Sequence, residues 1–288
     1  MRNFIIIFAE KEGTSPLIRL LNNFEKISII HQVNTQDWEP FDMQNRGAMT
    51  LRNLEHCLDM VLNRESINFK QLNQIYTRTA NTPIEEFSGN VVTGLKMRFT
   101  TPGKNSLFWN RSPKNFTDDS FRRMMFNVLK RNDVVVFLAL RQDILKWALS
   151  KYHGDGTGQP GHLQFKLASG KIKRRAIGKI HVDSTRLKII ISQCVEAHAR
   201  KCRLMEDFNL AGIQSHSLIY EDFLTDKQKV LNRILDILEL NTTIEEIAAA
   251  LKRGTYFEKV HSDDITNFVV NHEEVMEKFA KYHSGLNH

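Results

Sequence analysis

The sequence has no long apolar segment and few cysteines. Its longest uninterrupted apolar stretch near the N-terminus, Phe4 to Ala9, is far too short to span a bilayer, and the residues before it lack the layout of a signal peptide. The three cysteines, Cys57, Cys194 and Cys202, have no metal-ligand spacing, and their odd number argues against a disulfide framework. We therefore predict a cytoplasmic protein without stable membrane insertion.

Signatures of nucleic-acid binding and of nucleoside-triphosphatases are missing too. Basic residues are dispersed, the aromatic content is an ordinary 9%, and there is neither a stacking platform nor a zinc pattern. No Gly-Lys-Ser or Gly-Lys-Thr run occurs, which excludes the standard phosphate loop. The formal net charge of +7 still favours an anionic partner. We expect a nucleotide rather than nucleic acid.

The length and composition fit one large α/β domain. The chain has 288 residues, 41% of them apolar and 25% charged, which is typical of globular proteins. We predict a single domain over residues 1–288. A glycine-rich loop and a basic hairpin, at residues 153–179, form the expected insertion.

Apolar runs typical of buried strands alternate with helical patterns along the chain. Such alternation predicts a central, mainly parallel sheet flanked by helices, with right-handed crossovers. Strands are expected at residues 4–8, 27–33, 91–99, 133–140 and 217–220. Helices are expected from Pro16 to Phe24 and at residues 50–63, 118–130, 144–152, 184–209 and 226–238.

A turn containing glycine and hydroxyl residues follows the first predicted strand. It runs from Lys11 to Pro16 and reads Lys-Glu-Gly-Thr-Ser-Pro. Such a turn directs backbone N–H groups and the positive end of a helix at one point, which suits an anion. Gly13 permits close approach, while Thr14 and Ser15 add hydroxyl donors. The pattern equally fits a plain helix start with Thr14 or Ser15 as N-cap.

A second candidate follows the best central strand, where open α/β sheets bind ligands. It runs from Arg141 to Ser150 and reads Arg-Gln-Asp-Ile-Leu-Lys-Trp-Ala-Leu-Ser. The guanidinium fork of Arg141 suits a phosphate, and Ser150 on the next helix could donate to the same group. In the alternative interpretation Arg141 and Asp143 form a surface ion pair and Ser150 faces solvent.

With a third block, Tyr220-Glu221-Asp222, these segments resemble the sulfotransferases that use 3′-phosphoadenosine-5′-phosphosulfate (PAPS). The chain is most similar to the bacterial glycolipid-type (trehalose-type) members, through the Arg141 block and the Gly-x-Lys strand that begins at Gly94. The resemblance implies a three-layer P-loop-like fold. The blocks occur in the family's order and cover most of the chain.

The resemblance also implies roles for single residues. Lys11 would neutralise charge on the leaving phosphate oxygen, and Arg141 and Ser150 would hold the 3′-phosphate. Tyr220 would contact adenine. The 5′-phosphate would lie in the loop made by Lys11, Glu12, Gly13, Thr14, Ser15 and Pro16. Glu12 departs from the family, where a small residue is usual, and we expect it to point outward.

The general base and the C-terminal segment that closes over the 3′-phosphate are less clearly marked. For the base we favour Glu39, with Asp37, Asp42 and His31 as alternatives. For the closing segment we favour Lys259 over the run from Lys252 to Gly254. No metal is expected, because Lys11 can supply the charge stabilisation. Cys194, His198 and Cys202 recur on one helix face, which indicates core packing rather than a metal site.

The sequence does not identify the acceptor. A sugar, a lipid-linked alcohol, a phenol and a peptide tyrosine all stay open, as does a homodimer. Two other functions compete with sulfuryl transfer. One is a P-loop-like kinase, and the other is a noncatalytic nucleotide-binding protein.

Overall fold

The computed structural model describes residues 2–9, 11–30, 55, 58–59, 62, 92–98, 119–156, 179–254 and 264–283. Its centre is a sheet of five strands in the order β2-β3-β1-β4-β5, and every neighbouring pair is parallel. The strands are β1 Phe4–Phe8, β2 Ile27–Ile30, β3 Val92–Arg98, β4 Val135–Leu140 and β5 Ser215–Ile219. Because all strands run the same way, their carboxyl ends share one edge of the sheet.

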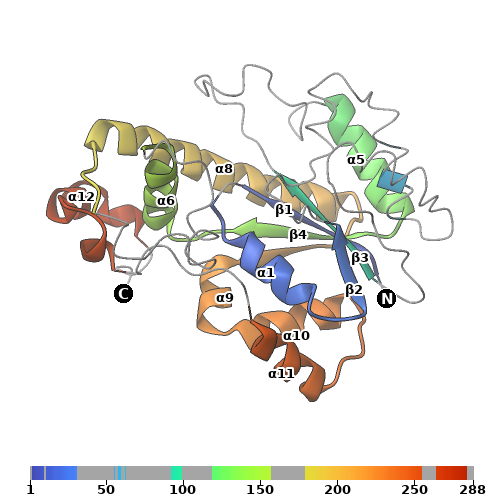
Figure 1. Cartoon of the computed structure of the whole chain (residues 1–288). Coiled ribbons are helices and arrows are strands. Elements are labelled where there is room, and N and C mark those ends of the chain that lie inside the picture. The colour runs from blue at the N-terminus through green and yellow to red at the C-terminus, as the bar shows by residue number, and fades with distance from the viewer. Residues whose placement is uncertain are drawn as a thin grey trace, which may run out of the picture.

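Helices cover both faces of the sheet, which gives three layers (Figure 1). On one face lie α5 (Asp119–Arg131) and α8 (Ser184–Leu210), packed on Ile5 and Ile7. On the other lie α1 (Thr14–Leu21), α10 (Lys227–Ile237) and α11 (Ile244–Arg253), packed on Phe4 and Ile6. Successive residues of β1 thus serve opposite layers, as a strand with both faces buried requires. The predicted three-layer α/β fold, with a central parallel sheet flanked by helices, is confirmed.

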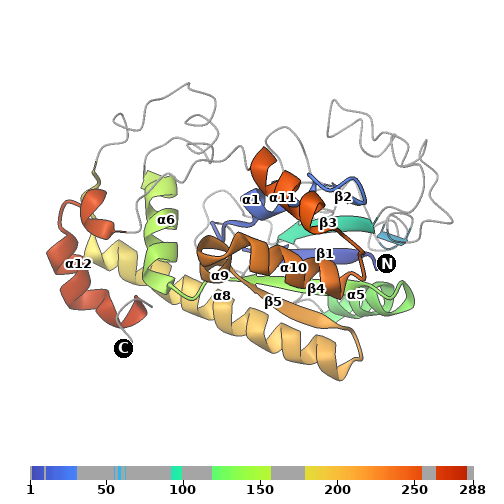
Figure 2. The ribbon, with the colours of Figure 1, turned by 90° about the horizontal axis from the view of Figure 1, so that it is seen from below.

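A third apolar cluster lies beyond the carboxyl edge of the sheet. It joins α6 (Ile144–Gly156) and the first half of α8 to α12 (His272–Phe279) and a short 3₁₀ turn, η3 (Ile265–Asn267). Figures 1 and 2 show α6 and α12 at the end of the molecule opposite the N-terminus. Helices α6 and α12 therefore lie beyond the carboxyl ends of the strands. None of the helices in the described ranges is long and apolar enough to cross a membrane.

Most predicted elements in the described ranges agree with the structure, apart from the differences that follow. Most of the helix predicted at residues 50–63 lies outside those ranges. The last strand ends at Ile219, so Tyr220 does not end a strand but begins the short helix α9 (Tyr220–Thr225). Helix α6 continues to Gly156, so the expected insertion does not start at His153. Helix α11 was not predicted, although Thr243 and Glu246 form a capping box at its start. Residues 157–178, which include the predicted basic hairpin, lie outside the described ranges.

Candidate active site

The turn after β1 leaves the start of α1 without a side-chain cap. Gly13 occupies the N-cap position with φ 74°, so the alternative in which Thr14 or Ser15 is the N-cap is wrong. Lys11 also has a positive φ of 64°, an unusual conformation for a residue with a side chain. Pro16 lies in the first helical turn, as predicted. The first-turn N–H groups of α1 thus point away from the helix with no cap from Gly13, which suits an anion.

Gly13 packs directly against the ring of Tyr220. A Cβ added at Gly13 would lie 2.1 Å from Cε2 and 2.3 Å from Cδ2 of that ring, distances that no side chain can accept. A glycine is therefore required here both by φ and by Tyr220. The predicted site residues Gly13 and Tyr220, far apart in the sequence, are in contact.

Glu12 points inward, which overturns the expectation that its side chain faces solvent. The side chain is 2% exposed. One carboxylate oxygen accepts the N–H of Ala9, and the other pairs with the Nζ of Lys201 from α8. Lys201 is itself fully buried and also donates to the carbonyl of Ala139 in β4. Burial raises the pKa of Glu12 and lowers the pKa of Lys201, while their mutual attraction opposes both shifts.

Arg141 reaches from the end of β4 to the turn after β1. Its Nη1 donates to the carbonyl of Lys11 at 3.0 Å, and its guanidinium lies 4.7 Å from the centroid of the Tyr220 ring. The Nε is 4.0 Å from a carboxylate oxygen of Glu221 and makes no hydrogen bond with the described residues. A buried guanidinium with donor capacity to spare is suited to binding an anionic group.

Carboxylates accept hydrogen bonds from the backbone N–H groups where β4 meets α6. Glu221 accepts the N–H of Gln142 at 3.0 Å and that of Asp143 at 3.1 Å. Asp143 accepts the N–H of Lys146 at 2.9 Å, as an N-cap of α6 does, and pairs with His283 at 2.7 Å. Asp143 therefore has partners other than Arg141, contrary to the surface ion pair considered above.

Lys96 is a second lysine at this site that we did not assign from the sequence. It lies on β3, is 4% exposed, and places its Nζ 3.5 Å from the Oγ of Ser15 and 4.0 Å from the centroid of the Phe8 ring. The sequence did mark Lys96, because it is the lysine of the Gly-x-Lys pattern, but we used that pattern only for the family resemblance. Gly94 of the same strand accommodates the ring of Phe4, which would lie 2.4 Å from an added Cβ.

Helix α6 carries one predicted site residue, Ser150, and one that we did not predict, His153. Ser150 is half-buried, and no hydrogen bond among the described residues joins it to Arg141. His153 is buried, and both burial and the positive charge of Lys11 lower its pKa. His153 therefore lies within electrostatic reach of the turn after β1, although we did not predict it as a site residue.

Several predicted residues cannot be placed at the site. Glu39, Asp37, Asp42, His31 and Lys259 lie outside the described ranges. The alternative closing segment, Lys252 to Gly254, ends α11, and Arg253 donates to the carbonyl of Asn23 after α1. That contact lies at the amino edge of the sheet, so this segment does not close the site.

Of the cysteine and histidine stripe on α8, Cys194 packs in the interior, while His198 and Cys202 are half-buried. Cys194 is fully buried, and burial raises the pKa of its thiol to about 12. Within the part of the chain that the structure describes, no group of three potential ligands could hold a metal ion.

Known proteins resemble this chain in fold. Neither a family model nor a curated protein matches its sequence. A sulfotransferase from Alicyclobacillus acidocaldarius matches at 15% identity over 98% of this chain and 92% of its own, with a TM-score of 0.44. Mouse sulfotransferase SULT7A1 complexed with PAP matches at 11% identity over 98% and 82%, with a TM-score of 0.46.

A third match is the sulfotransferase domain of the Synechococcus PCC 7002 olefin synthase, at 14% identity over 97% of this chain and 96% of that domain, with a TM-score of 0.39. These solved structures are all sulfotransferases.

Proposed function

We propose that this protein moves a sulfuryl group from PAPS to a hydroxyl of an acceptor molecule. The observation that carries the proposal is the meeting of three sequence blocks at the carboxyl edge of the sheet. The turn that leads into the uncapped start of α1, the guanidinium of Arg141 and the ring of Tyr220 are in mutual contact there. Such a group of donors suits a nucleotide with two separate phosphates.

The 5′-phosphosulfate is assigned to the turn after β1. The first-turn amides and the hydroxyls of Thr14 and Ser15 supply hydrogen bonds, and Lys11 and Lys96 supply positive charge. The contact of Lys96 with Ser15 supports including Lys96 in this group. Backbone donors and lysines together stabilise a phosphate better than either does alone.

The 3′-phosphate is assigned to Arg141, with Ser150 as its second ligand. The buried guanidinium with spare donor capacity supports the first assignment, while the second depends on the family resemblance. Tyr220 fixes both Gly13 and Arg141 through its ring. We therefore assign Tyr220 to shaping the nucleotide site as well as to contacting adenine.

The proposed reaction is an in-line displacement at sulfur. The acceptor oxygen attacks, the bond from sulfur to the bridging phosphate oxygen breaks with its electron pair on that oxygen, and the acceptor proton passes to a general base. Lys11 neutralises the charge on the departing oxygen, so positioning and charge stabilisation lower the barrier without a metal. Glu39 is the proposed base, with Asp37, Asp42 and His31 as alternatives.

A kinase and a noncatalytic nucleotide-binding protein are the competing functions. Calorimetric titration tests the kinase first, with adenosine 3′,5′-bisphosphate (PAP) and ATP with magnesium as ligands. We expect micromolar binding of PAP, weak binding of ATP, and a loss of about 100-fold in PAP affinity for Arg141→Ala, because two charge-assisted hydrogen bonds disappear. Arg200→Ala is the control, because it also removes a positive charge but does so on α8 and not at Arg141. A preference for ATP would contradict the proposal.

Turnover then separates an enzyme from a binding protein. Release of PAP from PAPS is measured against a panel of sugars, lipid-linked alcohols, phenols and tyrosine peptides. We expect one class to accelerate release, and Lys11→Ala to lower the rate at least about 100-fold while PAP still binds. PAP binding without transfer to any class would favour the noncatalytic function.

A further inference from the structure

A buried ion pair links the proposed phosphate loop to three other elements. Lys201 extends from α8, pairs with Glu12 in the turn after β1 and donates to the carbonyl of Ala139 in β4. Its Nζ also lies 5.3 Å from the centroid of the Trp147 ring in α6. Glu12, Lys201 and Trp147 are each 2% exposed or less. The phosphate loop thus rests on a buried polar contact from the middle of a long helix.

Stability alone does not explain this pair. Two charges lose their hydration when they are buried, and well-packed apolar residues of similar size are often as stable or more so. A carboxylate in a phosphate-binding loop also repels the anion that the loop should bind. The pair therefore calls for a role in the site.

We propose that Lys201 is a positioning residue for the donor nucleotide. It holds the Glu12 carboxylate against the N–H of Ala9 and cancels its negative charge beneath the phosphate loop. This inference rests on the proposed function, because it concerns the same nucleotide site. The positive charge of Arg141 also acts on Glu12 and lowers the pKa of its carboxyl group.

The proposed role predicts different effects on nucleotide affinity for the removal of Lys201 and for the neutralisation of Glu12. Removing Lys201 leaves an uncompensated carboxylate next to the bound phosphates, so affinity for the nucleotide falls. Neutralising Glu12 removes a negative charge from the loop, so affinity does not fall. If the pair had only a structural role, removing Lys201 and neutralising Glu12 would both weaken nucleotide binding, in proportion to the loss of stability.

The test compares PAP affinity for Lys201→Met, Glu12→Gln and the double variant at mildly alkaline pH, where a carboxyl group is most fully ionised. We expect Lys201→Met to bind at least about tenfold more weakly, the effect of one unit charge at roughly 10 Å near a protein surface. Glu12→Gln and the double variant should bind within about threefold of the wild type. Unfolding temperatures are measured in parallel.

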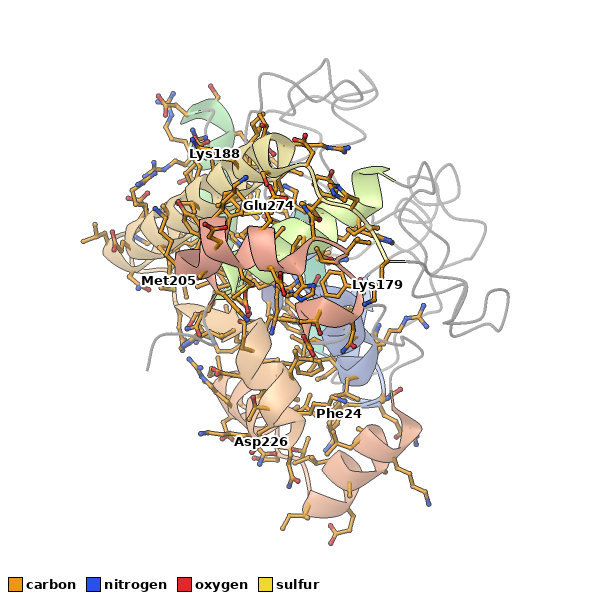
Figure 3. The ribbon with its side chains drawn as sticks, turned by 90° about the vertical axis from the view of Figure 1, so that its left-hand side faces the viewer. Phe24, Lys179, Lys188, Met205, Asp226 and Glu274 are labelled. Carbon is orange, nitrogen blue, oxygen red and sulfur yellow. The ribbon has the colours of Figure 1, made fainter. Side chains whose placement is uncertain are left out.

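Matched controls are available on exposed positions. Lys188→Met removes the same charge from the exposed side of α8 (Figure 3), and Glu25→Gln does the same for a carboxylate after α1. Equal weakening by Lys201→Met and Glu12→Gln, or wild-type affinity in Lys201→Met, would overturn the inference. If Lys201→Met does not fold, a tenfold loss in the double variant overturns it. A wild type that does not bind PAP overturns the proposed function as well.

Discussion

The two strand-to-helix junctions at the carboxyl edge of the sheet differ in how their backbone amides are used. Between β1 and α1, the N-cap is a glycine and no side chain caps the helix from that position. Between β4 and α6, Glu221 accepts two N–H groups and Asp143 accepts a third. At the first junction the amides at the start of α1 are open to an anion, and the Glu12 carboxylate accepts only the N–H of Ala9 before the turn. At the second junction, carboxylates accept the amides where the helix begins.

This difference assigns separate tasks to the two junctions. An open helix start binds a phosphate through its amides. A helix start already bonded to carboxylates cannot, so it contributes through a side chain, here Arg141. The carboxylates at the second junction also hold fixed the backbone from which Arg141 extends. A donor with two phosphates needs both kinds of subsite.

The largest expected effect comes from closing the open junction with a methyl group. Gly13→Ala places a Cβ within 2.1 Å of the Tyr220 ring at a φ of 74°. We expect the free energy of unfolding to fall by about 3 kcal/mol from strain and overpacking, with loss of PAP binding. Chemical denaturation and calorimetry measure the two effects.

Gly212→Ala is the control, because Gly212 has a φ of 75° and no atom within 4 Å of an added Cβ. It should lose only about 1 kcal/mol from the positive φ. Equal losses in the two variants would mean that contact with Tyr220 does not matter.

A smaller effect is expected when the capped junction loses its charge. Glu221→Gln weakens two charge-assisted hydrogen bonds to Gln142 and Asp143, so stability should fall by about 1 kcal/mol. PAP affinity should fall several-fold, because Arg141 loses a fixed backbone. The neighbouring Asp222 is exposed, and Asp222→Asn should change neither quantity. Thermal unfolding and calorimetry of the pair provide the measurement.

The smallest effect concerns a carboxylate far from both junctions. Glu274 accepts hydrogen bonds from Lys278, Ser184 and Asn271, which lower its pKa from the usual 4.5 to about 2. A carboxyl group whose pKa is lowered on folding stabilises the folded state at pH values above 4.5. This stabilisation disappears as the pH falls toward 2.

The difference in unfolding temperature between the wild type and Glu274→Gln should therefore vanish over that pH range. PAP affinity should be unchanged. The same pH dependence in Glu273→Gln, at an exposed position, would contradict this assignment.

The sequence predicts the sheet and most helices because their apolar patterns are strong and local. The buried run of β4 and the amphipathic face of α5 are examples. The boundary at Tyr220 is missed because an aromatic residue suits the end of a strand as well as a helix start. Strand patterns alone do not show where pairing with β4 stops.

The site is predicted as a set of blocks but not as a set of contacts. Glu12 is recognised as unusual, yet its inward direction depends on Lys201, almost 200 residues away in the chain. Lysine is rarely buried without a partner, so the sequence gives no reason to place Lys201 in the interior. The pattern that stands out on α8 is instead the spacing of Cys194 and His198. Pairing across the fold decides both orientations.

Amide hydrogen exchange, measured by NMR with and without PAP, tests the contrast between the two junctions most directly. In the free protein the N–H groups of Gln142 and Asp143 should be protected by Glu221, whereas those of Thr14 and Ser15 should exchange faster. Saturation with PAP should slow exchange at Thr14 and Ser15 most strongly. Unchanged exchange at these two amides in the presence of bound PAP would contradict the proposal that the open start of α1 binds the donor phosphate.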